Sequence, residues 1–156
     1  LIKGGCDPLL LARRLVVHSA EDVGMADPQA LVIATSAMVA FEKMGLPEGL
    51  LPLSQAIIYV CEAEKSNSVV VAMDMAGEDA VNVKDDTVPP WVKNAVYGSE
   101  EDKKLASKYK YPHNYGGFVE QQYLPDSLKD RVYYTPSDNG YEKVVKQIRK
   151  NKGKTK

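Results

Sequence analysis

Cysteine and histidine are scarce in this sequence of 156 residues, with two of each. Cys6 and Cys61 form no C-x-x-C pair, and His18 and His113 belong to no H-E-x-x-H motif. Zinc-type sites need several closely spaced ligands, so this pattern predicts no metal site. Two separate thiols favour reduced cysteines in a cytoplasmic protein over a disulfide.

Motifs for nucleotide binding and membrane insertion are absent as well. There is no G-x-x-x-x-G-K-[ST] stretch, which would supply the backbone amides that hold a triphosphate. There is no run of 18 or more apolar residues and no signal-peptide pattern, so we expect a soluble protein without membrane contact. We assign no catalytic residue and no cofactor-binding residue to the chain.

Two pairs of adjacent carboxylates, Glu21–Asp22 and Asp85–Asp86, are the remaining candidates for acid–base chemistry. Neighbouring residues on a helix point about 100° apart, so Glu21 and Asp22 are not expected to share a site. Both pairs are interpreted as helix-end or loop charges. His18 would need a partner to act as a general base, and the sequence identifies none.

What the sequence does contain is an ordinary globular composition, 44% hydrophobic and 26% charged, at a length that suits one domain. The net charge of −1 hides an asymmetry: residues 1–98 carry 7 Lys and Arg against 13 Asp and Glu, whereas residues 99–156 carry 13 against 8. The tail from residue 143 onward has only basic charges, and these are the candidate DNA contacts. They are Lys143, Lys146, Arg149, Lys150, Lys152, Lys154 and Lys156. Such a tail is either a solvated, frayed end or a flexible contact with nucleic-acid phosphates.

Apolar residues recur at steps of three and four in the first half of the chain, which predicts a mainly α-helical fold. The predicted helices span residues 9–23, 28–44, 48–63 and 66–83. Asp7–Pro8 and Asp27–Pro28 are each an N-cap followed by proline at the first helical position. The second and third helices are apolar on nearly every face, unlike ordinary surface helices. Either they lie centrally in an antiparallel array or one exposes an apolar face to another subunit, and we expect both.

After Val83 the pattern becomes irregular. Residues 84–98 are interpreted as a connector. Ser99 with Asp102 resembles a capping box at the start of a short helix that ends near residue 108. A short strand is predicted around residues 131–134, and a last helix from about residue 138 into the basic tail.

Tyrosines gather in this second half, where seven of the nine lie between Tyr109 and Tyr141. Lys108 and Lys110 interleave with Tyr109 and Tyr111, an arrangement that could stack the bases of a single strand. The alternative is that the tyrosines pin an irregular segment onto the helices, with the ring buried and the hydroxyl in water. We favour the second interpretation for most of them.

Several short segments recur in the order and spacing of a known family. They are Gly4–Pro8 with Ala12–Leu15, Ser19–Pro28, Tyr59 with Lys65–Asn67, Val88–Pro89, Asn94–Ala95, Tyr111 with His113, Gln122–Pro125, and Tyr134 with Pro136, Gly140 and Glu142. In this order they resemble the C-terminal region of the RarA/MgsA family, replication-associated AAA+ ATPases related to the eukaryotic Werner-helicase-interacting protein. Two stretches differ from the family pattern. Pro90–Val92 replaces a more polar, usually histidine-containing stretch, and residues 96–109 lack a glycine-rich loop.

The resemblance implies a single collar-like C-terminal domain of a clamp-loader-related ATPase, of the kind that assembles homotetramers. Its parts would be a helical core at about 7–83, the connector at 84–98, a tyrosine-rich extension at 99–142 and the basic tail at 143–156. The ATPase residues, and with them ATP and magnesium, would lie upstream, so this fragment is not expected to be an enzyme.

The same resemblance implies a full-length DNA-stimulated ATPase that acts at stalled replication forks. Its partners would be copies of itself, DNA and replication proteins, and in a bacterium it would associate with the nucleoid. The rival hypothesis is a self-contained DNA-binding or adaptor module that acts through its basic tail. A small independent enzyme has little support in the sequence.

Overall fold

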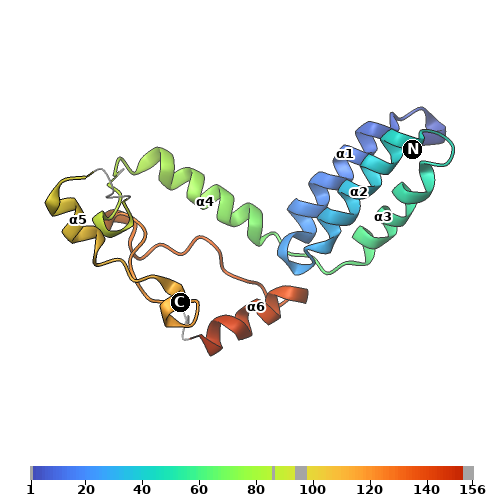
Figure 1. Cartoon of the computed structure of the whole chain (residues 1–156). Coiled ribbons are helices and arrows are strands. Elements are labelled where there is room, and N and C mark those ends of the chain that lie inside the picture. Colours follow the sequence, from blue (N-terminus) through green and yellow to red (C-terminus); the bar gives the residue numbers. More distant parts are fainter. Residues whose placement is uncertain (1, 86, 94–97, 153–156) are drawn as a thin grey trace. The chain divides into compact units, whose positions relative to one another are not determined.

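The computed structural model describes residues 2–85, 87–93 and 98–152, and within these ranges the regular structure is all helical (Figure 1). This confirms the predicted mainly α fold. The α-helices are α1 (Pro8–His18), α2 (Gln29–Met44), α3 (Leu50–Glu62), α4 (Ser68–Asn82), α5 (Glu100–Ala106) and α6 (Gly140–Asn151). Five residues named in the sequence analysis lie outside the described residues: Asp86, Asn94, Ala95, Lys154 and Lys156.

The helix starts follow the predicted capping chemistry. Asp7 Oδ1 accepts the backbone N–H of Leu9 at 2.9 Å where α1 begins, and Asp27 Oδ1 accepts that of Gln29 at 3.0 Å where α2 begins. The capping box of α5 is also present, with Ser99 and Asp102 bonded to each other's backbone N–H. These side chains satisfy amides that the first turn of a helix leaves without partners.

The predicted strand around residues 131–134 is wrong. These residues form neither helix nor strand, and no strand occurs within the ranges that the structure describes. A β-branched and aromatic run favours extended backbone, but it makes a strand only where a neighbouring strand supplies the hydrogen bonds.

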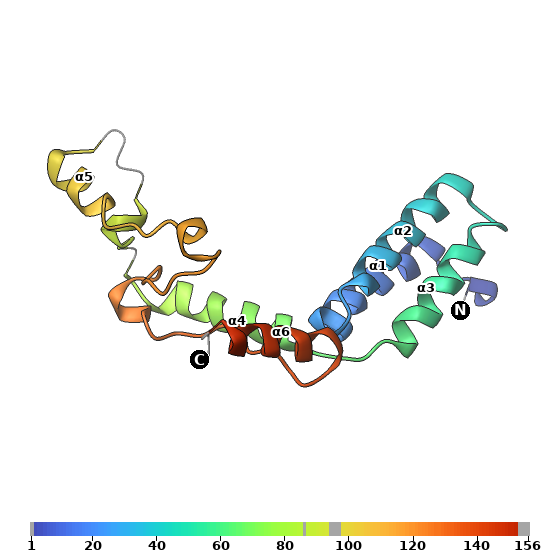
Figure 2. The same ribbon diagram turned by 60° about the horizontal axis from the view of Figure 1, so that its bottom comes forward.

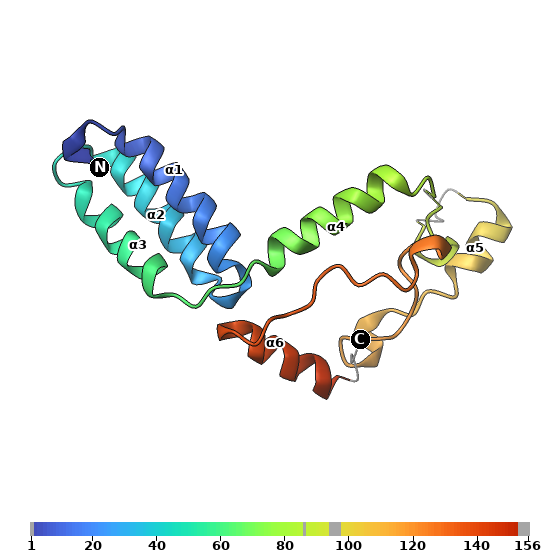
Figure 3. The same ribbon diagram turned by 180° about the vertical axis from the view of Figure 1, so that it is seen from behind.

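The first three helices lie side by side, and α2 packs against both α1 and α3 (Figures 1 and 3). The side chains buried between them are mostly small. They are Ala12, Ala30, Ala34, Ala37 and Ala56, together with the larger Val23, Phe41, Leu53 and Val60. Alanine has no side chain beyond Cβ, so these three helices approach one another closely but bury little apolar area per residue.

The chain divides into two compact units, and the division falls within α4, between Met75 and Ala76. Unit 1 contains residues 1–75 and 133–156, and unit 2 contains residues 76–132. The segment from Tyr133 onward therefore falls in the same unit as the first helices.

Unit 2 is held together mainly by polar contacts that link distant parts of its chain. Arg131 binds Asp79 through two bonds of 2.8 Å, from Nη2 to Oδ1 and from Nε to Oδ2. The indole N–H of Trp91 donates to the carbonyl oxygen of Gln122 at 2.7 Å. Figure 2 shows α5 and the irregular loops that make up most of the rest of this unit.

The expectation that most of the late tyrosines have buried rings is wrong. Five of the seven tyrosines from residue 109 onward are exposed, with exposed fractions between 39% and 54%. They are Tyr109, Tyr111, Tyr115, Tyr123 and Tyr141. Four of the five lie in unit 2, in whose described part none of the buried hydrophobic core residues occurs, and Tyr141 lies on α6 in unit 1.

None of the helices in the described part of the chain combines the length and the apolar character needed to cross a bilayer.

Gly140 provides a test of how the last segment is attached. Its φ is +47°, and a Cβ at this position would collide with the carbonyl oxygen of Ala26. We predict that Gly140→Ala lowers the free energy of unfolding by about 2 kcal/mol or more, because backbone strain and the collision add.

The matched control is Gly77→Ala in the middle of α4, where a Cβ would meet nothing within 4 Å. This change should raise the free energy of unfolding by about 0.5–1 kcal/mol, because alanine favours the helix. Urea unfolding followed by circular dichroism measures both, and equal effects of the two substitutions would contradict the assigned backbone geometry.

Candidate functional site

A buried carboxylate, Glu142 in the first turn of α6, organises the end of unit 1. Its side chain is 0% exposed. Oε1 accepts hydrogen bonds from the hydroxyls of Ser68 at 2.5 Å and Tyr134 at 2.9 Å, and Oε2 accepts the backbone N–H of Ser137 at 2.9 Å. The carboxylate therefore joins the start of α4, the segment that leads to α6, and α6 itself.

The hydrogen bonds around Glu142 determine its protonation. Burial alone would raise the pKa of this carboxyl, but the hydrogen bonds from Ser137, Ser68 and Ser66 outweigh burial and lower the pKa to about 2. Burial, followed by the hydrogen bond to Glu142, raises the pKa of the Tyr134 hydroxyl to about 12. Glu142 is thus charged and Tyr134 is a neutral donor at neutral pH.

The Lys65–Asn67 motif lies beside this carboxylate and joins α3 to α4. Lys65 Nζ donates to the carbonyl oxygens of Val60, Cys61 and Ala63, which α3 leaves unpaired at its C-terminus. The Lys65 carbonyl in turn accepts the side-chain amide of Asn139 at 2.8 Å. Lys65–Asn67 and the start of α6, which the family resemblance identifies as separate segments, therefore meet in one junction.

The described basic residues of the tail fall into two groups on α6. Lys146 is half-buried and donates to Asp138 at 2.8 Å, and Arg149 donates to the Tyr134 carbonyl at 3.0 Å and lies over the Tyr134 ring. Both are thus engaged within the chain. The other group is exposed to solvent and consists of Lys143, Lys150 and Lys152.

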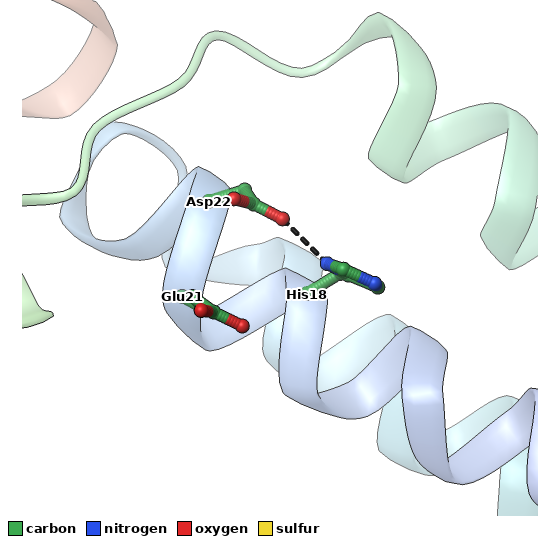
Figure 4. A group of neighbouring side chains, drawn as sticks. All are labelled: His18, Glu21 and Asp22. Carbon is green, nitrogen blue, oxygen red and sulfur yellow. Dashed lines mark hydrogen bonds and ion pairs between the residues drawn. The ribbon is translucent and has the colours of Figure 1, made fainter.

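His18, Glu21 and Asp22 form an exposed group at the end of α1 (Figure 4). One ligand atom from each residue lies within 4.8 Å of the others, and His18 Nδ1 is 2.6 Å from Asp22 Oδ2. The sequence interpretation kept Glu21 and Asp22 apart on an ideal helix. The chain instead continues from α1 into one wide π-helical turn, Ser19–Val23, which changes the spacing. All three side chains are exposed, so the group has the geometry of a surface ion pair beside a third charge.

Two shallow apolar grooves lie on the helices of unit 1. One of about 750 Å³ is bordered by α1 and α3 and includes Leu11, Leu15 and Ile57. The other, of about 610 Å³, follows the outer face of α2. It is lined by Leu31, Val32, Thr35, Ser36, Val39, Ala40 and Lys43. Neither groove contains an arranged catalytic group.

The role of Glu142 is the main feature that sequence reasoning missed. Its partner Ser68 is 74 positions away, so no local pattern connects the two. The available signal was the family motif itself, in which Ser66 and Glu142 recur together with Tyr134 and Gly140.

Together, the alanine-rich helical bundle and the junction around Glu142 define an all-α domain. The family model described as "MgsA AAA+ ATPase C terminal" matches residues 1–152, and the chain belongs to this family as its C-terminal domain.

Relatives with 31% to 43% identity match most of this chain. Replication-associated recombination protein A of Bacillus subtilis is 43% identical over 150 residues, which are 95% of this chain and 35% of that protein. The protein of the same name from Escherichia coli K12 is 35% identical, over 91% of this chain and 32% of its own length. The ATPase WRNIP1 of Dictyostelium discoideum is 31% identical, over 86% of this chain and 16% of its own length. The chain thus spans about a third of the bacterial relatives named here.

The depressed pKa of Glu142 makes a prediction about acid stability. Its folded pKa of about 2 lies below the ordinary value of 4.5, so its contribution is complete above about pH 5 and is lost as the pH falls toward 2. We predict that Glu142→Gln lowers the free energy of unfolding at pH 7 by on the order of 2 kcal/mol. The difference from the unsubstituted chain should shrink as the pH falls from 5 to 2.

Thermal melts over this pH range measure the effect, with Glu62→Gln as the control because Glu62 is an exposed carboxyl in the same unit. A difference between Glu142→Gln and the unsubstituted chain that stays constant from pH 7 to pH 2 would show that the charge of Glu142 does not stabilise the fold.

Proposed function

We propose that this chain is the oligomerisation domain of a DNA-dependent AAA+ ATPase of the RarA/MgsA type, and that it assembles as a homotetramer. The observation that carries the proposal is the distribution of apolar side chains in unit 1. Five of the nine side chains buried between α1, α2 and α3 are alanines, whereas many large apolar residues lie at the surface of the same helices. The exposed ones on α2 and α3 include Leu31, Val32, Val39, Leu51 and Ile58.

Such a distribution suits assembly better than a free monomer. Stable subunit interfaces are often large and apolar and resemble a domain core cut in half. Closed homo-oligomers use the same patch on every copy. An apolar surface of this extent on a domain with a small alanine core therefore supports burial against other copies.

The outer face of α2 is the surface that we assign to a subunit contact. From Leu31 to Ala40 it carries no charge, and Lys43 is the first charged residue that lines it. Thr35, Ser36 and Ala40 are short, so a helix from another copy can approach closely between the ridges formed by Leu31, Val32 and Val39.

A double substitution on α2 tests the proposal. We predict that the unsubstituted chain is a tetramer by light scattering, also at roughly 1 M salt, where exposed charges are screened within about 3 Å. Val32→Glu with Val39→Glu should raise the dissociation constant at least about a hundredfold, because unpaired carboxylates are costly to bury.

The control for the α2 test is Gln55→Glu, which adds one negative charge at an exposed position of α3. A folded monomer at tens of micromolar, without concentration dependence, would overturn the proposal. A tetramer that survives the double substitution would move the contact away from α2.

The same proposal places nucleotide chemistry outside this chain. ATP and magnesium would bind to the part of the full-length protein that precedes this domain, and this domain would not be an enzyme. The full-length protein would act in replication, recombination and repair at stalled forks, with DNA and replication proteins as partners. It would be cytoplasmic, and associated with the nucleoid in a bacterium.

The exposed lysines of α6 favour a second role, DNA binding through the basic tail. Lys143, Lys150 and Lys152 are exposed, whereas Lys146 and Arg149 have partners within the chain. Removal of the whole tail would also remove the contacts of Arg149 with Tyr134, so substitution is a cleaner test than deletion.

We predict that replacing Lys143, Lys150 and Lys152 together with Gln weakens duplex DNA binding uniformly across sequences. Three phosphate contacts correspond to a slope of log K against log salt that is less steep by about 2–3. Fluorescence anisotropy at several salt concentrations measures this slope. Lys146→Gln is the control, because Lys146 is already engaged with Asp138. An unchanged slope in the triple variant would make the tail a solvated end.

A further inference from the structure

Unit 2 presents a group of exposed aromatic rings that the oligomerisation role does not use. We call residues 109–123 the tyrosine loop. Four of its side chains are exposed by 39% to 54%: Tyr109, Tyr111, Tyr115 and Tyr123. An exposed tyrosine is unremarkable by itself, but four within 15 consecutive residues give this segment an unusual density of exposed aromatic rings.

Hydrogen bonds within the tyrosine loop hold it in one conformation. The side-chain amide of Gln121 pairs with the backbone of Lys110 in both directions, at 3.1 Å each, and also donates to the Tyr123 hydroxyl at 2.8 Å. Residues 112–115 form a 3-10 turn, in which the Asn114 N–H donates to the Tyr111 carbonyl at 3.0 Å. The rings of Tyr111, Tyr115 and Tyr123 thus project from a closed and ordered loop.

The first part of the loop and the segment before it are basic, although Glu120 near the end of the loop is acidic and exposed. Residues 103–119 contain four lysines and no aspartate or glutamate. Lys108 and Lys110 are exposed and alternate with Tyr109 and Tyr111, and the His113 ring lies 4.9 Å from the Tyr111 ring. A ligand that matches this surface has flat apolar faces and regularly spaced negative charges.

We infer that the tyrosine loop is a binding site for single-stranded nucleic acid. Unpaired bases stack on the rings of Tyr111, Tyr115 and Tyr123, and Lys108 and Lys110 contact the phosphates between them. Base stacking on aromatic side chains with nearby cations tolerates any sequence, because every base has a flat face. An uncharged protein partner would cover the rings but would leave the lysines without partners.

This site is distinct from the lysines of α6. The lysines of α6 belong to unit 1. They offer only positive charge, which attracts phosphates, so they bind duplex and single strand alike. The tyrosine loop needs bases that are free to unstack. The inference deepens the proposed action on DNA and does not depend on the oligomeric state.

The first experiment compares single strands with ligands of the same length that offer no unpaired bases. Binding of the chain is measured for four ligands: (dT)15, (rU)15, a duplex of the same length, and an abasic 15-mer that has phosphates but no bases. Trp91 is the single tryptophan, and its N–H donates to the carbonyl of Gln122, next to Gln121 and Tyr123, so its fluorescence reports on this loop. We expect (dT)15 to bind at least about tenfold more tightly than the abasic strand and the duplex.

The affinity for (rU)15 relative to that for (dT)15 decides whether the site prefers RNA or DNA. Equal affinity for (dT)15 and the abasic strand would overturn the inference, because lysines alone would then account for binding. No binding of any single strand would overturn it too, and would assign the rings to a protein partner.

The second experiment uses matched substitutions. Tyr111→Ala and Tyr115→Ala should each weaken (dT)15 binding about tenfold, whereas Tyr111→Phe and Tyr115→Phe should bind normally because stacking needs only the ring. Tyr141→Ala on α6 is the control, since Tyr141 is equally exposed but lies in unit 1. Circular dichroism confirms that each variant is folded. Unchanged binding in both alanine variants would overturn the inference, as would an equal loss in Tyr141→Ala.

Light scattering on the same samples separates this inference from the proposed oligomerisation. A tetramer that shows no preference for bases would refute the site and leave the proposed assembly standing. A monomer that prefers unpaired bases through Tyr111 and Tyr115 would refute the assembly and leave the site standing.

Discussion

The charge of Glu142 is the constraint on which the end of unit 1 depends. A buried carboxylate is costly unless hydrogen bonds replace the lost water, and here Ser68, Tyr134 and the Ser137 N–H do so. Because these donors come from three separate segments, the carboxylate is satisfied in only one arrangement of α4, the connecting segment and α6. That arrangement places Arg149 on Tyr134 and leaves Lys143, Lys150 and Lys152 in solvent. A polar interaction in the interior therefore determines which cations are available at the surface.

The helical bundle follows from a different constraint, the small size of its interior side chains. Alanines at the contacts let α1, α2 and α3 approach closely, but each contributes little buried area. Apart from the buried Phe41, Leu53 and Val60, several larger residues of α2 and α3 lie at the surface. The groove along α2 and the exposed Leu51 and Ile58 of α3 are thus consequences of the same packing that forms the bundle. In the proposed tetramer, association would supply the apolar burial that the isolated bundle lacks.

The parts that the sequence predicted correctly are those that depend on nearby residues. Helix periodicity, the caps at Asp7 and Asp27, and the capping box at Ser99 each involve residues within a few positions, so a single sequence contains the information. Glu142 could not be predicted in this way, because Ser68 is 74 residues distant. The tyrosines were misjudged because burial depends on how much apolar surface a segment meets, and unit 2 offers little. The group around His18 was missed because a wide turn replaced the ideal helical spacing.

The proposed assembly and the inferred tyrosine loop would reinforce each other. A surface of a few stacked rings and two lysines is small, and a single copy would bind a strand weakly. In an oligomer, a strand held by one copy meets the loop of the next at a high effective concentration, which can raise the overall affinity by about 10²–10⁴ without any new contact. Base stacking also persists at salt concentrations that screen lysine–phosphate attraction. An assembly held by apolar helix faces and engaging unpaired bases through tyrosines would therefore respond less steeply to salt than one that relied on the lysines of α6, because neither of its two main interactions is a charge pair.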